Sequence, residues 1–94
     1  MEIIWRRRAL EDLETARAYI ARDNPGASRR VLDLILSAVS RLPKTPDIGR
    51  PGRVTGTREL VIPRTPYLVA YTVLGDQLHI LDVLHGAQEW PDTF

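Results

Sequence analysis

The sequence predicts an α+β fold in which a helical hairpin packs on a small antiparallel sheet. Two segments with apolar residues at helical spacing come first, and three apolar, strand-like segments follow them. A short β-prone run at residues 3–5 precedes both helices, so the predicted order is β-α-α-β-β-β. With 94 residues the chain can form one small core, and we expect a single domain over residues 1–94.

The two helices are predicted at residues 7–22 and 25–42. In the first, Leu10, Leu13, Ala16 and Ile20 recur at helical spacing. Between the helices, a proline at position 25 disfavours the helical conformation at position 24 and suits the first turn of a helix that an asparagine can cap. Apolar residues fill an arc of roughly 200° on the second helix. A stripe this wide must be covered by both the first helix and a sheet.

The strands are predicted at residues 58–63, 66–74 and 77–86, after a loop rich in proline and glycine at residues 43–57. A two-residue Gly75-Asp76 turn would pair residue i with residue 151 − i, so that Tyr67 faces Leu84. This register predicts which side chains face the helices: Tyr67, Val69, Tyr71, Val73, Leu78, Ile80, Leu84 and, without explanation, Asp82. The other side of the sheet would carry Leu68, Ala70, Thr72, His79, Leu81, Val83 and His85 as a partly apolar, open face.

Several classes of site are disfavoured by composition. The chain has no cysteine, so it has neither disulfides nor a thiolate metal site. The two histidines lie about 20 Å apart on one strand, too far to share a metal ion. No glycine-rich phosphate loop is present. We therefore expect no cofactor, no metal and no catalytic residue. The apolar runs are too short for a membrane span, and the amino terminus is unlike a signal peptide, which predicts a cytoplasmic protein.

The charges are distributed unevenly along the chain. Residues 1–64 contain all 13 lysines and arginines and eight of the 12 acids, whereas residues 65–94 contain the other four acids. The bases could form an ordinary solvated surface, or Arg50, Arg53, Arg58 and Arg64 could contact phosphate or an acidic peptide. Trp90 could be a local lid on the core or an aromatic anchor in an interface. His85 is expected to be a structural residue at the strand end rather than a general base.

Four segments together resemble the RelE/ParE superfamily of bacterial toxins: ALEDLETARAYIARDNPGAS, IGRPGRVTGTRELVI, PYLVAYTV and ILDVLHGAQEWP. The RELVI stretch and the ending are most similar to the ParE branch. This resemblance implies a ParD-like antitoxin that folds around the toxin and connects it indirectly to operator DNA. ParE toxins inhibit DNA gyrase, whereas RelE toxins cut messenger RNA on the ribosome.

The resemblance also distinguishes the two branches. The RelE branch commonly has an arginine where this chain has Leu68, another near His85, and a tyrosine where this chain has Trp90. RNA cleavage needs cations and a group that moves a proton, so their absence favours a non-enzymatic gyrase inhibitor. A ribosome-dependent endonuclease and a non-toxic co-regulator stay as alternatives. The predicted contacts are Arg50, Arg53, Arg58, Leu68, Ala70, Leu81 and Val83 for the antitoxin, and His85 and Trp90 for the target.

Overall fold

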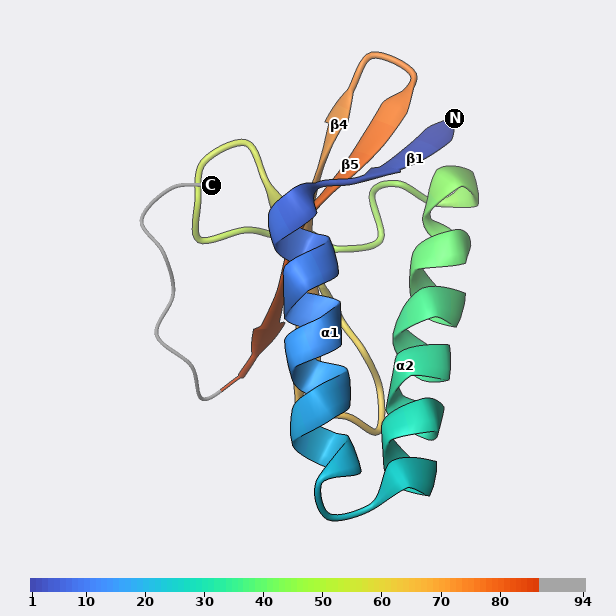
Figure 1. The fold of residues 1–94 in the computed structure, drawn as a ribbon. Helices are drawn as coiled ribbons and strands as arrows, with labels where there is room; N and C mark the ends of the chain where they lie inside the picture. The colour runs from blue at the N-terminus through green and yellow to red at the C-terminus, as the bar shows by residue number, and fades with distance from the viewer. Residues whose placement is uncertain (87–94) are drawn as a thin grey trace.

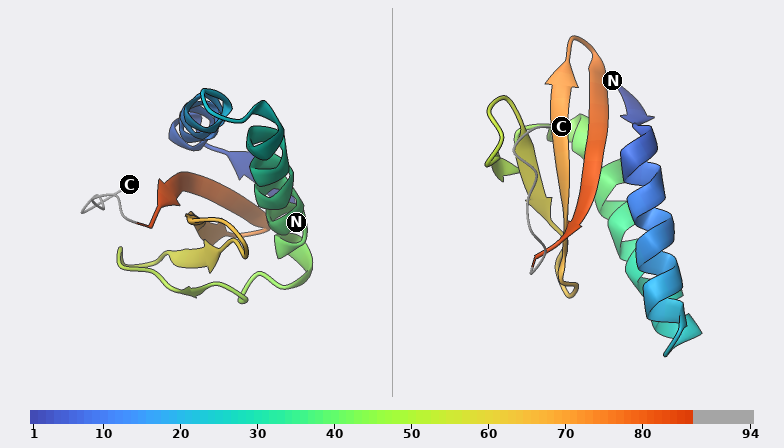
Figure 2. Two further views of the ribbon diagram at one scale, coloured as in Figure 1. Left: turned by 90° about the horizontal axis from the view of Figure 1, so that it is seen from below. Right: turned by 60° about the vertical axis from the view of Figure 1, so that its left-hand side comes forward.

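The computed structural model describes residues 1–86 and places two helices on one face of a five-stranded sheet (Figures 1 and 2). The elements are β1 (Glu2–Trp5), α1 (Arg7–Ala21), α2 (Pro25–Ser40), the short 3-10 helix η1 (Leu42–Lys44), β2 (Arg50–Pro51), β3 (Arg58–Val61), β4 (Tyr67–Leu74) and β5 (Gln77–His85). The strand order is β1-β5-β4-β3-β2, in which β1 pairs with β5 in parallel and the other pairs are antiparallel. The predicted α+β class and element order are confirmed, and β2 is an additional strand inside the predicted loop.

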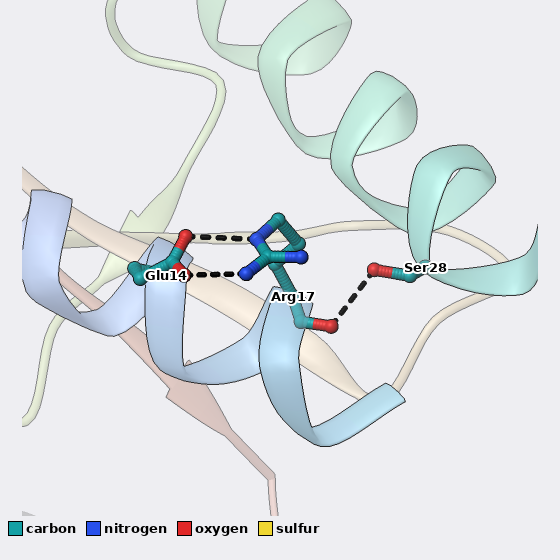
Figure 3. A network of polar contacts seen from close by, with 3 residues as sticks. All are labelled: Glu14, Arg17 and Ser28. Atoms are coloured by element: carbon teal, nitrogen blue, oxygen red, sulfur yellow. Dashed lines mark hydrogen bonds and ion pairs between the residues drawn. The ribbon is translucent and has the colours of Figure 1, made fainter. Parts of the chain in front are cut away.

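Polar contacts join the two helices at their connection. The Asn24 side chain accepts a hydrogen bond from the Ala27 N–H at 3.0 Å and caps α2 as predicted. The buried Ser28 hydroxyl donates to the Arg17 carbonyl of α1 at 2.9 Å, and Arg17 also pairs with Glu14 (Figure 3). Within residues 1–86, neither helix is long and apolar enough to cross a lipid bilayer.

The main core lies between the helical hairpin and the sheet. Helix α1 contributes the small buried residues Ala9 and Ala16, which let its backbone approach the strands closely. Helix α2 contributes Ile35 and Val39, both almost completely buried. From the sheet, the buried residues of this core are Tyr67, Val69, Tyr71, Leu78, Ile80 and Val83.

A β-bulge changes the predicted register of the last hairpin. Gly75 has a φ of 62°, as the predicted turn requires, and Tyr71 faces Ile80. Leu81 is then an extra residue on β5, so that Ala70 faces Asp82. Tyr67 therefore faces His85, and its predicted pairing with Leu84 is wrong by one residue.

The extra residue also exchanges the two sides of β5 beyond Ile80. Val83 and His85, predicted on the open face, lie on the helix side, where Val83 joins the main core and His85 contacts Tyr67. The predicted helix-side residue Leu84 lies instead on the other face. There it forms an outer cluster with Leu68, Ala70 and Leu81.

The outer cluster is buried, contrary to the prediction of an open apolar face. Its four residues are 0 to 7% exposed. The segment between β2 and β3 lies on this side of the sheet, opposite the helices (Figure 2). The Thr72 hydroxyl on β4 donates to the Gly56 carbonyl of that segment at 2.8 Å.

Tyr71 anchors the loop rich in proline and glycine to the sheet. Its hydroxyl donates to the Pro46 carbonyl at 2.7 Å and accepts a hydrogen bond from the Gly49 N–H at 2.9 Å. A Cβ at Gly49 would lie 2.7 Å from the tyrosine ring, so the close approach requires glycine. One buried phenol thereby fixes a loop that lacks regular structure over much of its length.

We expect Tyr71→Phe to destabilise the fold by about 1–3 kcal/mol, because it leaves a buried N–H and a carbonyl without their partner. Thermal and urea unfolding would measure the loss. Tyr67→Phe is the matched control, since no hydrogen bond of the Tyr67 hydroxyl is present among residues 1–86. Equal stability of the two variants would contradict the anchoring role.

Candidate functional site

Two of the predicted binding arginines have structural roles inside the chain. Arg50 forms a salt bridge with Glu59, in which the guanidinium Nε and Nη2 each lie 3.1 Å from Oε1. Glu59 is only 3% exposed, so this cation compensates a buried charge. The Arg58 guanidinium donates to the carbonyls of Asp47 and Gly49 at 3.2 and 2.8 Å.

Arg53 has an exposed side chain, and its backbone N–H donates to Glu59 Oε2 at 2.8 Å. The hydrogen bond to Glu59 therefore does not depend on the arginine side chain.

A basic groove runs between the end of α2 and the strand β3. Its volume is about 420 Å³, and its lining includes Arg41 and Arg50. Ile48 and Val61 also line it and are 63% and 50% exposed. Glu59, the partner of Arg50, lines the groove as well, so Arg41 gives it a net positive charge. Exposed apolar side chains beside this charge suit the apolar face of an acidic amphipathic segment.

An acidic groove of similar volume, about 420 Å³, lies between α1 and the end of β5. It exists because β1 ends at Trp5, where the Arg6 N–H makes a last hydrogen bond to the Ile80 carbonyl. Beyond that point α1 runs beside the edge of β5. The groove is lined by Asp12, Thr15, Ala16, Tyr19, Tyr67, Val83 and His85.

Asp12 connects α1 to the unpaired edge of β5. Its Oδ2 accepts the Val83 N–H at 2.9 Å, in place of the carbonyl of a neighbouring strand. Burial raises the pKa of the Asp12 carboxyl, while the Val83 N–H and the charge of Arg8 oppose that rise. The rings of Tyr67 and His85 meet edge to face with their centroids 5.4 Å apart, and burial also raises the pKa of the Tyr67 phenol.

Sequence reasoning did not single out Asp12 and Tyr19 as site residues, because neither is among the periodic apolar positions of the first helix. Their spacing carries the signal. Asp12, Ala16 and Tyr19 recur at intervals of four and three, which places them on one face of α1.

Asp82 lies in the bulge and is 1% exposed. The Arg8 Nε of α1 approaches its Oδ2 to 3.2 Å. This contact is an ion pair without hydrogen-bond geometry, because neither carboxylate oxygen of Asp82 has a hydrogen bond within residues 1–86. The bulge thus accounts for an acid that the regular register placed on the helix side, and Arg8 is its counter-ion.

His79, near the beginning of β5, is hydrogen-bonded to two other side chains. Its Nδ1 accepts a hydrogen bond from the Arg6 Nε at 2.9 Å, and its Nε2 lies 3.0 Å from the Gln77 Oε1. Both ring nitrogens are thus engaged.

Within residues 1–86, no three His, Cys, Asp or Glu side chains are grouped closely enough to hold a metal ion. The predicted target contact Trp90 lies outside the described residues.

We expect Arg50→Glu to lower stability by about 1–3 kcal/mol, because it places a second carboxylate beside the buried Glu59. Arg53→Glu should lower stability less than Arg50→Glu, since the backbone N–H that donates to Glu59 and the Arg50 guanidinium both remain. Thermal unfolding of both variants checks this difference. A stable Arg50→Glu variant would show that Glu59 tolerates burial without the cation.

We expect Asp12→Asn to be more stable than the wild type at pH 7. A carboxyl whose pKa is raised on folding carries a penalty above that pKa, and the penalty vanishes below the ordinary aspartate value. The amide oxygen can still accept the Val83 N–H. Unfolding curves from pH 3 to pH 8 should therefore converge in acid and diverge toward neutral pH. A variant less stable than the wild type at pH 7 would contradict this account.

Comparisons with known proteins all find similarity to toxins or to a toxin–antitoxin system. A family model described as the ParE toxin of type II toxin–antitoxin system, parDE, matches residues 3–90. A Sinorhizobium fredii protein named as a candidate toxin, Y4kP, is 45% identical over 91 residues, which are 97% of this chain and 94% of that protein. Toxin RelE2 of Caulobacter vibrioides is 32% identical over 87 residues, or 93% and 97% of the two chains. A solved structure described as the chromosomal ParDE TA system from P. aeruginosa superposes with a TM-score of 0.82 at 27% identity and covers 90% of this chain and 95% of its own.

Proposed function

Because the chain belongs to the ParE toxin family of type II toxin–antitoxin systems, we propose that it inhibits DNA gyrase and is neutralised by a ParD-like antitoxin. The observation that favours gyrase inhibition over RNA cleavage is the side chain at position 68 of the sheet. Leu68 occupies the position at which the RelE branch commonly has an arginine, and it is 6% exposed in the outer cluster. A buried leucine cannot stabilise charge on a reacting phosphate.

The antitoxin partner is supported by the similarity to a ParDE system. We propose that acidic antitoxin residues contact the basic groove with its Arg50, and also Arg53 and Arg58, because charge and exposed apolar surface coincide at the groove. Operator DNA would then be reached only through the antitoxin. The earlier candidates Leu68, Ala70 and Leu81 are buried, and Val83 lies in the main core. They would meet an antitoxin only if the packing around them opens.

The target contacts stay a proposal centred on His85 and Trp90. His85 lines the acidic groove at the end of β5, so a partner at this end of the molecule can reach it. Trp90 is the aromatic residue that the sequence places four residues after Gly86. Tryptophan is enriched among residues that dominate binding energy in interfaces.

A ribosome-dependent endonuclease is the second candidate because Arg6 lies beside His79. A cation next to an imidazole is part of what RNA cleavage requires. Against this function, both nitrogens of His79 are already engaged, so the ring has no lone pair available to take a proton in this arrangement. Two relatives are named as RelE toxins, which makes a direct test necessary.

We expect the purified protein to inhibit DNA supercoiling by gyrase and to leave messenger RNA intact in a translating extract at equimolar concentration. Trp90→Ala should weaken inhibition by at least tenfold with little change in melting temperature, as loss of an interface anchor does. Supercoiling assays and primer extension on the extract measure the two activities. Glu14→Gln, an exposed change on α1, serves as the matched control.

Cleavage of messenger RNA by the wild type that disappears in a His79→Ala variant would reverse the assignment in favour of the endonuclease. Tight binding to the co-encoded antitoxin without either activity would instead indicate the non-toxic co-regulator.

A further inference from the structure

We propose that the acidic groove binds a basic side chain, lysine or arginine, of a bound protein partner, with Asp12 as its counter-ion and aromatic rings as its walls. This inference rests on the proposed function, because the partner to which it commits is the antitoxin. It adds a second contact region of opposite charge to the basic groove. The two grooves lie beside different helices, next to α1 and next to the end of α2.

Asp12 provides a carboxylate of which one oxygen is fixed by a hydrogen bond and the other is available to a ligand. Oδ2 accepts the Val83 N–H at 2.9 Å, which fixes the carboxylate against β5. No hydrogen bond to Oδ1 is present among residues 1–86. A fixed carboxylate with one available oxygen can accept a charge-assisted hydrogen bond from a guanidinium or an ammonium group.

Among residues 1–86, no lysine or arginine forms an ion pair with this carboxylate. Arg8, one turn earlier on α1, is the base whose charge acts on Asp12, but its Nε lies 3.2 Å from the buried Asp82. The sheet side of the groove cannot contribute one, since the sequence has no lysine or arginine after Arg64. Glu11 is the other charged group that acts on Asp12, and it is negative. The surroundings therefore favour a cation from another molecule.

The walls of the groove suit the same ligand. Tyr19 is 66% exposed and lines the groove together with Tyr67 and His85. Aromatic ring faces attract ammonium and guanidinium groups, and the alkyl part of lysine or arginine packs well on aromatic surface. An apolar side chain would fill the same walls but would leave the Asp12 carboxylate desolvated without a partner, which is unfavourable. Charge complementarity thus selects a basic residue.

The first test uses small probes and does not depend on the antitoxin. Nα-acetyl-argininamide should shift the backbone amide signals of Val83 and His85 in the 15N-labelled protein. The uncharged isostere Nα-acetyl-citrullinamide should bind at least tenfold more weakly. Asp12→Asn should abolish the difference between the two probes, whereas Glu14→Gln, a carboxylate change on the same helix, should preserve it. Equal binding of both probes to the wild type would overturn the proposal.

The second test measures the dissociation of the co-encoded antitoxin from the full-length chain at low salt. We expect Asp12→Asn and Tyr19→Ala each to raise the dissociation rate by at least tenfold, and Glu14→Gln to leave it unchanged. If the antitoxin binds tightly but Asp12→Asn dissociates like the wild type, this inference fails while the proposed function stands. If no antitoxin binding occurs in any variant, the proposed function fails.

A third measurement separates a partner side chain from a free cation. Spermidine at millimolar concentration should compete with the arginine probe only weakly, because a single carboxylate cannot hold several ammonium groups. If spermidine binds in the groove more tightly than the arginine probe by tenfold or more, the ligand is a free polyamine and the assignment to a partner side chain is wrong.

Discussion

The bulge at Leu81 is the constraint on which the arrangement of the functional surfaces depends. One extra residue on β5 exchanges the two sides of the strand, so that Val83 and His85 face α1 and Leu84 joins the outer cluster. The bulge lies next to Ile80, where β1 gives way to α1 beside the strand edge. Asp12 then accepts a hydrogen bond from the Val83 N–H at the strand edge, and the acidic groove forms around that contact. Without the bulge, this groove would lose its wall of Val83 and His85.

Local sequence signals predicted most of the fold. The helices followed from apolar periodicity, their connection from Asn24 and Pro25, and the hairpin turn from Gly75. The bulge could not be placed, because neither glycine nor proline marks it and strict alternation is the default for a strand. Asp82 was the one available hint, since the regular register put an acid against the core. Its misfit marked the position at which the register changes.

The candidate site was less predictable, because the relevant contacts are distant in sequence. Arg50 stood out in a predicted loop rich in proline and glycine and Arg58 directly after it, and their type suggested a ligand. Their partners, Glu59 and two backbone carbonyls, lie nine to eleven residues away and become neighbours only when β2 and β3 pair. Asp12 was overlooked for the same reason, since its partner Val83 is 71 residues away. Residue type indicates what a side chain can bind, and only the tertiary fold determines whether the chain already provides it.

The fold places the unevenly distributed charges of the chain on separate surfaces. The bases end at Arg64, just before β4, so β4 and β5 carry no positive charge into the centre of the sheet. The basic groove forms beside β3, where Arg41 and Arg50 contribute to its lining, and the acidic groove forms between α1 and the end of β5. A partner that contacts both grooves must present acidic and basic residues in a matching order. Such a pattern disfavours binding in the reverse direction, because like charges would then face each other. Opposite charge on the two grooves thus offers a physical basis for recognising one antitoxin in one orientation.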